Sequence, residues 1–199
     1  ALAEWFIKDG SVIYDLGCST GESIKNICKL NTKTKFEIIG YDSSKKMIDL
    51  AKKKLNLKKL KKEGVNVSLK TLDILKIKKF KKSDLFLSLL LFPFINLHNR
   101  EKIMRNIYKS LNPGGGFILV EKIRSSDPQF EDILNQLYFD FKLRQNLTES
   151  EILKKAKSLR SSMFLFNEKK TSQLIKKVGF NSYEVFFKCF NFIGYIIIK

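Results

Sequence analysis

The stretch DLGCSTG, residues 15–21, decides the fold of this 199-residue chain. It follows an apolar run, Val12–Tyr14, that predicts a strand, and it precedes a helical pattern of apolar residues that begins at Ile24. Gly17 and Gly21 permit a sharp turn and let a ligand approach the bare backbone. Because a helix N-terminus offers free N–H groups and a partial positive charge, the stretch predicts a strand–loop–helix unit that binds a ligand.

The alternation of strand and helix patterns continues to the end of the chain. Apolar or alternating runs predict further strands at residues 36–40, 65–69, 84–91, 117–120, 183–190 and 193–198. Helical spacing is found in the sets 47/48/51/55, 103/104/107/111 and 174/175/178, and in residues 132–141 and 149–159. The pattern predicts a single α/β domain over residues 1–199: a Rossmann-like, doubly wound, mostly parallel seven-stranded sheet with a C-terminal antiparallel hairpin.

Polar and glycine residues predict where several of these helices begin or end. Ser43 or Ser44 is suited to cap the helix that contains Ile48. Residues 112–116, NPGGG, are expected to stop the helix that contains Ile103 before the strand that starts at Phe117, and Gly179 is expected to stop the last helix.

The net charge of the chain raises the question of whether it binds nucleic acid. The formal net charge is +18, and of 38 basic residues only five are arginine, the residue that most often recognises phosphates and bases specifically. The lysine run at residues 52–64 has no interleaved aromatic residue for base stacking. Compositional drift explains the charge at least as well as nucleic-acid binding, so only a weak association with RNA is expected.

Several function classes lack the residues that they require. His98 is the only histidine, which disfavours a His-based metal site or a Ser-His-Asp triad, and three scattered cysteines form neither a disulfide framework nor a zinc spacing. No apolar run is long enough for a membrane span, so no membrane partner and a cytoplasmic location are expected. The chain begins without Met in what resembles the middle of a helix, so a preceding segment is expected.

Three predicted strand ends each carry a carboxylate: Asp15, Asp42 and Asp73. In doubly wound sheets ligands bind beyond these ends. A carboxylate at Asp42 can accept hydrogen bonds from ribose hydroxyls, and one at Asp73 can accept a bond from an adenine amine. The acidic Asp15 suits a positively charged ligand group. Together they favour S-adenosylmethionine, whereas each acid taken alone is more often a cap or turn residue.

The chain resembles the class I S-adenosylmethionine-dependent methyltransferases and, more narrowly, the carboxy-S-adenosylmethionine synthase family. The narrower resemblance rests on DLGCS, on the pair Asp42–Ser43, and on three later segments: EKIRSSDPQFEDILNQLYFDFK (121–142), SEILKKAKSL (150–159) and YEVFFKCFNF (183–192). It implies a homodimer that uses prephenate as carboxyl donor to make carboxy-S-adenosylmethionine, which a partner enzyme uses to modify wobble uridine in tRNA.

The resemblance also implies the residues that contact the cofactor. Added to the carboxylate Asp15 and the loop glycine Gly21, they are Gly17, Cys18, Ser19, Asp42, Ser43, Asp73, Ile74 and Ser88. Two positions depart from the family: Ser88 replaces an asparagine, and Ala156 replaces an arginine suited to the carboxylate of the product. Arg160, one helical turn later, either takes over that contact or faces solvent behind an apolar stripe formed by residues 152, 153, 156 and 159.

Two other functions compete with the synthase. The lost arginine favours an ordinary methyltransferase that acts on a small molecule or RNA, and the charge with the two altered positions favours a module that binds cofactor without catalysis. No catalytic residue is predicted beyond the carboxylate contact at Arg160, and no metal is expected.

Overall fold

The computed structural model describes residues 1–31 and 33–199. These residues form a seven-stranded sheet in the order β3-β2-β1-β4-β5-β7-β6. The strands are β1 (Ser11–Leu16), β2 (Phe36–Asp42), β3 (Val65–Thr71), β4 (Ser83–Leu89), β5 (Leu111–Lys122), β6 (Ser182–Cys189) and β7 (Phe192–Ile198). The first five pair in parallel and the last two form an antiparallel hairpin against β5, which confirms the predicted fold class.

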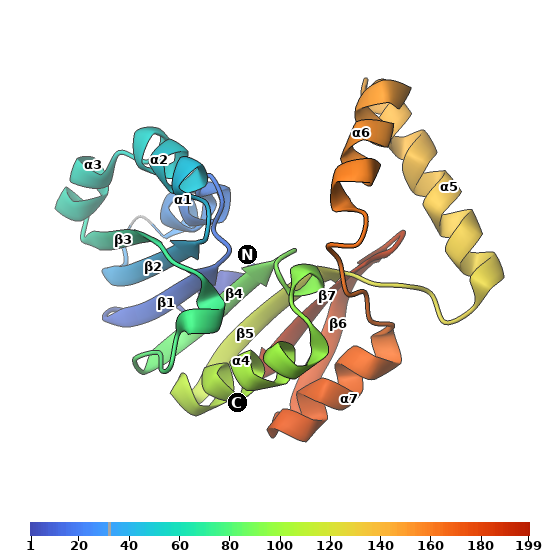
Figure 1. Ribbon diagram of the computed structural model, residues 1–199. Coiled ribbons are helices and arrows are strands. Elements are labelled where there is room, and N and C mark those ends of the chain that lie inside the picture. The colour runs from blue at the N-terminus through green and yellow to red at the C-terminus, as the bar shows by residue number, and fades with distance from the viewer. Residues whose placement is uncertain (32) are drawn as a thin grey trace.

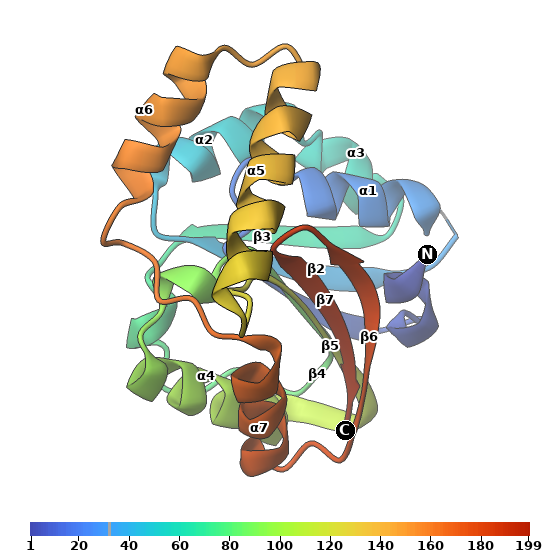
Figure 2. The same cartoon turned by 90° about the vertical axis from the view of Figure 1, so that its right-hand side faces the viewer.

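Seven α-helices connect the described strands: α1 (Glu22–Leu30), α2 (Lys45–Lys54), α3 (Leu57–Lys62), α4 (Leu97–Ser110), α5 (Pro128–Arg144), α6 (Glu149–Leu159) and α7 (Glu168–Val178). Figures 1 and 2 show α1, α2 and α3 on one side of the sheet and α4 and α7 on the other. Helices α5 and α6 stand away from the sheet on the side of α1 and α2. We call this helix pair, residues 128–159, the arm.

The core consists of two apolar layers, one on each face of the sheet. Ile24, Ile27 and Cys28 of α1 are buried against one face, as their spacing predicts, and Ile103 and Met104 of α4 are buried against the other. On the second face Tyr14 stacks on Phe86, with ring centroids 5.0 Å apart. These layers fix the strand ends from which the candidate site is built.

Several predicted boundaries differ from the structure: β4 ends at Leu89 rather than at Leu91, and the start of β5 differs most. Strand β5 begins at Leu111 rather than at Phe117, so Leu111 belongs to the strand and not to the preceding helical stripe. The register shifts here: Ser83 pairs with Leu111 and Leu85 with Gly116, so NPGGG bulges within the edge of the strand instead of forming a separate turn.

Other boundaries follow the predicted signals. Ser44, not Ser43, caps α2 by accepting a hydrogen bond from the Met47 N–H at 3.3 Å. Gly179 ends α7 with a φ of 117°, a left-handed conformation that glycine adopts without strain. Helix α3 was not predicted, because its lysine-rich sequence has little apolar periodicity. Among the described residues, no helix is long and apolar enough to cross a membrane.

Candidate functional site

The loop after β1 is folded tightly against the end of β2. Gly17, Ser19 and Gly21 all have positive φ, at 75°, 48° and 76°. The N–H groups of Gly17 and Cys18 both donate to the Tyr41 carbonyl, at 2.8 and 2.9 Å. The strand order reverses between β1 and β4, so this loop lies at the topological switch point where such sheets bind ligands.

Asp42 joins this loop to the beginning of α2. Its Oδ2 accepts a hydrogen bond from the Ser19 N–H at 2.9 Å, and its Oδ1 accepts one from the Ser44 N–H at 2.8 Å. Each carboxylate oxygen has more than one lone pair, so Asp42 can still accept bonds from a pair of ligand hydroxyls. The turn role and the ligand role that the sequence leaves open are therefore compatible. Ser43, beside it, is exposed.

Asp15 lies beneath the loop and is almost wholly buried. Its carboxylate accepts a hydrogen bond from the Ser23 hydroxyl in the first turn of α1. Burial raises the pKa of Asp15 to about 6, the Ser23 bond opposes this rise, and the nearby negative charge of Asp42 adds to it. The structure thus brings two carboxylates together at the loop, an arrangement that a cationic ligand group would stabilise.

Cys18 packs into the core rather than presenting a reactive thiol. Its side chain is buried, and a Cβ built on Gly40 would lie 2.9 Å from its Sγ. Burial, with the charge of Asp15, raises the pKa of the Cys18 thiol. Only its backbone is suited to contact a ligand, and Gly40 leaves the space that the Cys18 side chain needs.

Asp73 and Ile74 follow β3 at the same edge of the sheet. Asp73 caps the short 3₁₀ helix Ile74–Lys76 by accepting a hydrogen bond from the Leu75 N–H at 2.9 Å through Oδ1. Ile74 is buried in the apolar layer between the sheet and α4. Asp73 is thus a cap, as the simpler alternative proposed, and its contact with a ligand stays a prediction.

Ser88 provides a test of fit that is independent of the loop. It lies on β4 directly beside Leu16, the last residue of β1, and its side chain is buried. Among the described residues its Oγ has no hydrogen-bond partner. Buried polar atoms nearly always have a partner, so an unpartnered hydroxyl at the switch point fits a site that a polar ligand completes.

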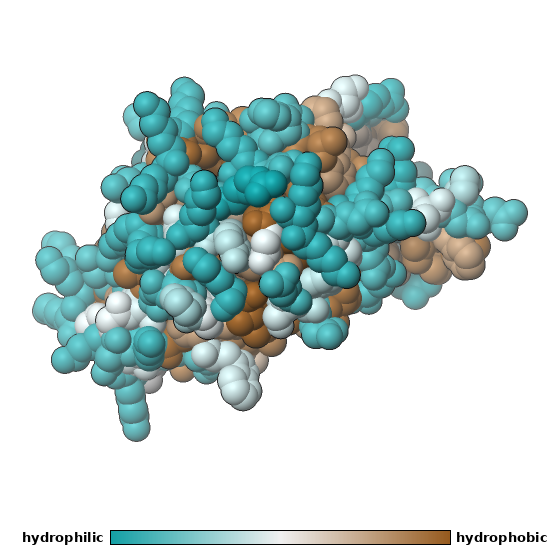
Figure 3. All heavy atoms as spheres, turned by 90° about the horizontal axis from the view of Figure 1, so that it is seen from below, coloured by the Kyte–Doolittle hydropathy of each residue, from teal (hydrophilic) through white to brown (hydrophobic). Residues whose placement is uncertain are grey.

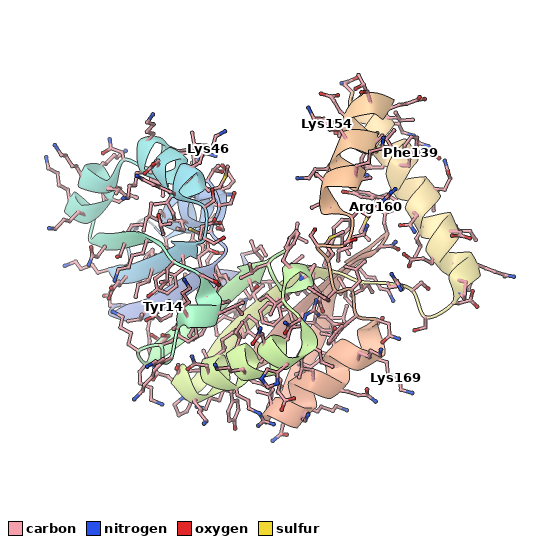
Figure 4. The ribbon with its side chains drawn as sticks, in the orientation of Figure 1. Tyr14, Lys46, Phe139, Lys154, Arg160 and Lys169 are labelled. Carbon is pink, nitrogen blue, oxygen red and sulfur yellow. The ribbon has the colours of Figure 1, made fainter. Side chains whose placement is uncertain are left out.

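Arg160 lies apart from these residues, at the end of α6 that joins the rest of the molecule (Figure 4). Its side chain is exposed and, within the described part of the chain, has neither an ion-pair nor a hydrogen-bond partner. Of the apolar stripe on α6, Ile152 is buried, whereas Leu153 and Ala156 are exposed. The apolar stripe is therefore not buried at those two residues. The carboxylate contact at Arg160 stays a prediction.

A buried ion pair between α4 and β5 was missed in the sequence. Arg100 and Glu121 are 1% and 0% exposed, and Arg100 Nη1 lies 3.1 Å from Glu121 Oε2. Arg100 also donates to the carbonyls of Ile95 and Phe164. Burial raises the pKa of Glu121, against the opposing effect of the Arg100 charge. The signal was present, because Arg100 continues the buried i, i+3, i+7 spacing of residues 103 and 107.

The hairpin between β6 and β7 holds α5 through residues in the middle of the helix. Asn191 Nδ2 donates to Asn135 Oδ1 at 2.8 Å, and the ring of Tyr138 lies 5.1 Å from that of Phe192 and 5.7 Å from that of Phe190. The segment 183–192, which carries the family resemblance, therefore attaches the arm to the sheet.

Comparisons with known proteins agree with this geometry. Residues 7–178 match the family described as methyltransferase domain. The carboxy-S-adenosyl-L-methionine synthase of Staphylococcus epidermidis is 34% identical over 98% of this chain and 82% of its own length, and that of Sulfurimonas denitrificans is 32% identical over 99% and 81%.

Solved structures share the fold at lower identity. Haemonchus contortus phosphoethanolamine N-methyltransferase 2, solved with S-adenosyl-L-methionine, superposes with a TM-score of 0.64 at 22% identity, over 92% of this chain and 36% of that one. Human N-acetylserotonin methyltransferase, also with that ligand, gives 0.62 at 16% identity, over 95% and 47%. This chain therefore spans between a third and half of those two structures, and the likeness concerns the fold.

Proposed function

The chain belongs to the carboxy-S-adenosyl-L-methionine synthase family, and from that premise we propose that it is a transferase that converts S-adenosylmethionine to its carboxy form. The observation that carries the proposal is that Asp15 and Asp42 lie close together at the loop of the switch point, while the unpartnered Ser88 hydroxyl lies at the end of the neighbouring strand β4. When bound, S-adenosylmethionine supplies the activated methyl carbon that receives the carboxyl group.

The residues of the chain bind and orient the reactants. Asp42 accepts hydrogen bonds from the ribose hydroxyls, Asp73 accepts one from the adenine amine, and Ile74 lies against the base. The backbone of Gly17–Ser19 approaches the methionine portion, whose ammonium group is stabilised by Asp15. Because these groups position and stabilise rather than exchange protons, proximity and electrostatic preorganisation account for catalysis.

We assign the added carboxylate of the product, carboxy-S-adenosylmethionine, to Arg160. A guanidinium matches a carboxylate in a forked pair, and the exposed Arg160 side chain has both donors available. Ala156 cannot make this contact. The alanine at position 156, in place of the family's arginine, supports the second candidate function, a methyltransferase that transfers the methyl group to another acceptor.

Mass spectrometry of the nucleoside products separates the two candidates. Incubation with S-adenosylmethionine and prephenate is expected to give a product with the mass increment of a carboxyl group. Formation of S-adenosylhomocysteine alone, once an acceptor is supplied, would support the methyltransferase instead. Asp42→Ala is expected to abolish cofactor binding in calorimetry, whereas Asp49→Ala, an exposed carboxylate on α2, serves as the matched control and is expected to bind normally.

Arg160→Ala tests the carboxylate contact separately. We expect the affinity for carboxy-S-adenosylmethionine to fall by about tenfold or more, with unchanged affinity for S-adenosylmethionine, because one charge-assisted bond is lost. Arg144→Ala, an exposed arginine at the end of α5, is the matched control on the same arm. An unchanged preference of the Arg160 variant for the carboxy product over S-adenosylmethionine would contradict the assignment.

We also propose that the chain forms a homodimer through the outer face of α5. Phe130, Ile133, Leu137 and Phe141 follow helical spacing and are 43–60% exposed. A row of large apolar side chains of this kind is typical of an interaction site. Analytical ultracentrifugation is expected to give a dimer for the native chain and a monomer for Ile133→Asp.

The cellular setting is proposed on the same basis. All three cysteines are free thiols, including the exposed Cys189, which suits a reducing compartment such as the cytoplasm. The product would serve a partner enzyme that modifies wobble uridine in tRNA.

A further inference from the structure

Two adjoining hollows run along one side of α4. The first has a volume of about 250 Å³ and begins beside Ile74 and Leu75, next to the candidate cofactor site. The second, of about 360 Å³, continues past Lys82 to Ser110 at the end of the helix. Lys78, Asn106 and Lys109 line both, so the hollows are contiguous. We call them together the α4 groove.

Basic side chains dominate the lining of the α4 groove. Among the described residues that line it there is no carboxylate, although the chain has 20 acidic residues. The basic residues of the lining are Lys78, Lys79, Lys81, Lys82, Lys102, Arg105 and Lys109. Figure 3, seen from the side where α4 and α7 lie in Figure 1, shows hydrophilic side chains over most of this face.

Several of these positive charges have no carboxylate to neutralise them. Lys81 pairs with Glu37 and Arg105 with Glu101, both outside the groove. In contrast, Lys82 Nζ donates to the Lys109 carbonyl at 3.0 Å. The positive charges also repel a neighbouring lysine: desolvation lowers the pKa of Lys199, and the charge of Lys82 lowers it further. An anionic partner would relieve this repulsion.

The shape and chemistry of the groove narrow the partner to a polyanion of extended form. From Asn99 to Lys109 it follows α4 for about 15 Å, a length that spans several phosphates of a nucleic-acid strand. Lysines act as point charges toward phosphate. The only aromatic residue of the lining, Phe80, is buried and cannot stack on bases. A flat membrane surface would reach the rim but not the hollows.

We propose that the α4 groove binds the phosphate backbone of an RNA stem without reading its bases. The groove itself points to a phosphate polymer, and the choice of RNA rests on the proposed function, whose product serves RNA modification. Bound there, the RNA would lie beside Ile74 and Leu75, at the edge of the candidate cofactor site, without occupying it.

A second lysine-rich surface provides a matched control. Helix α3 exposes Lys58, Lys61 and Lys62, and neither hollow is lined by them. Replacing these three by glutamate changes the net charge as much as the variant Lys78→Glu/Lys102→Glu/Lys109→Glu. If only the total charge attracts RNA, the two triple variants will bind it equally.

The experiment measures binding of a fluorescent RNA duplex of about 20 base pairs by anisotropy at several salt concentrations. We expect the groove variant to lose at least about tenfold in affinity and its salt slope to fall by about two to three, since each lost phosphate contact removes about one. The α3 variant is expected to change affinity by less than about threefold. Thermal melting checks that both variants are folded.

Equal losses in the two variants, or no loss in either, would overturn the proposal. So would groove-dependent binding to phosphatidylserine vesicles without binding to RNA. The carboxyl-transfer assay contains no RNA, and both triple variants are expected to retain its product. A failed RNA result with intact synthesis therefore refutes the groove alone, whereas failed synthesis in the native chain refutes the proposed function.

Discussion

Phe86 and Phe130 are the same residue type in two very different regions of the molecule. Phe86, on β4, is fully buried between Tyr14 and Phe80, whereas Phe130, on α5, is 60% exposed. No residue in the described helix α5 is buried, and α6 buries only Ile152. Buried apolar packing thus stabilises the sheet region, whereas a few polar and aromatic contacts between α5 and the β6–β7 hairpin hold the arm.

Large-to-small replacement should separate the two regions most strongly. Phe86→Ala is expected to lower the free energy of unfolding by about 4 kcal/mol, because it removes a buried ring and leaves a cavity. Phe130→Ala should change it by less than about 0.5 kcal/mol in the monomer. Denaturant unfolding of both variants measures the difference. Similar values would show that the arm is as tightly packed as the sheet.

The buried ion pair between α4 and β5, inside the sheet region, gives the next largest effect. Arg100→Met should destabilise the protein by about 3 kcal/mol, because it leaves the buried Glu121 without its charged partner. The loss falls at the low end for such pairs, since Thr171 still donates to Glu121 at 2.6 Å. Arg100→Met/Glu121→Gln should recover part of this stability. A double variant as unstable as the single one would show that shape, not charge, matters.

Within the sheet region, Asp15 should make the folding stability depend on pH. Its folded pKa, about 6, exceeds the unfolded value of 3.8, so the native state binds the proton more tightly. Asp15 therefore lowers stability as the pH rises from about 4 to 6, by up to about 3 kcal/mol. Asp15→Asn should be more stable than the native chain at pH 7.5 and equal to it near pH 3.

The same titration should appear in ligand binding. Affinity for S-adenosylmethionine is expected to rise as Asp15 ionises around pH 6, and Asp15→Asn should flatten that dependence. Calorimetry at pH 5, 6 and 7 on the two proteins measures it. A pH-independent affinity in the native chain would remove Asp15 from the ligand site.

The smallest effect concerns the attachment of the arm. Asn191→Ala removes the hydrogen bond to Asn135 and should cost about 1 kcal/mol. Because the bond belongs to the arm, hydrogen exchange should quicken in α5 while β1 and β4 keep their protection. Faster exchange throughout the sheet would mean that the two regions unfold together.

Sequence patterns predicted the helices of both regions but the burial of their faces only in the sheet region, for a physical reason. Ile24 and Ile48 are buried because each helix packs on the sheet, so periodicity and burial agree. On α6 the spacing of Leu153 and Ala156 is equally regular, yet both are exposed, because no described element covers that face. Periodicity identifies an apolar face but not what packs against it.

The candidate site shows the same division. Asp42 and the loop glycines were identified because strand order places them together. The positive φ of Ser19 and the bulge at residues 112–116 could not be predicted, since both depend on hydrogen bonds to distant strands. Where the exposed Arg160 lies depends on how α6 is held against the rest of the molecule, which no local pattern contains.

The two ends of the arm meet at one point of the sheet. The Arg124 N–H donates to the Phe166 carbonyl at 2.8 Å, and the Phe164 N–H donates to the Pro93 carbonyl at 2.7 Å. The chain thus leaves the sheet and returns to it through neighbouring residues. Such a segment can be lengthened, shortened or exchanged without shifting the register of any strand. The arm is therefore the part of this molecule whose length and sequence can change most while the loop after β1 stays unchanged.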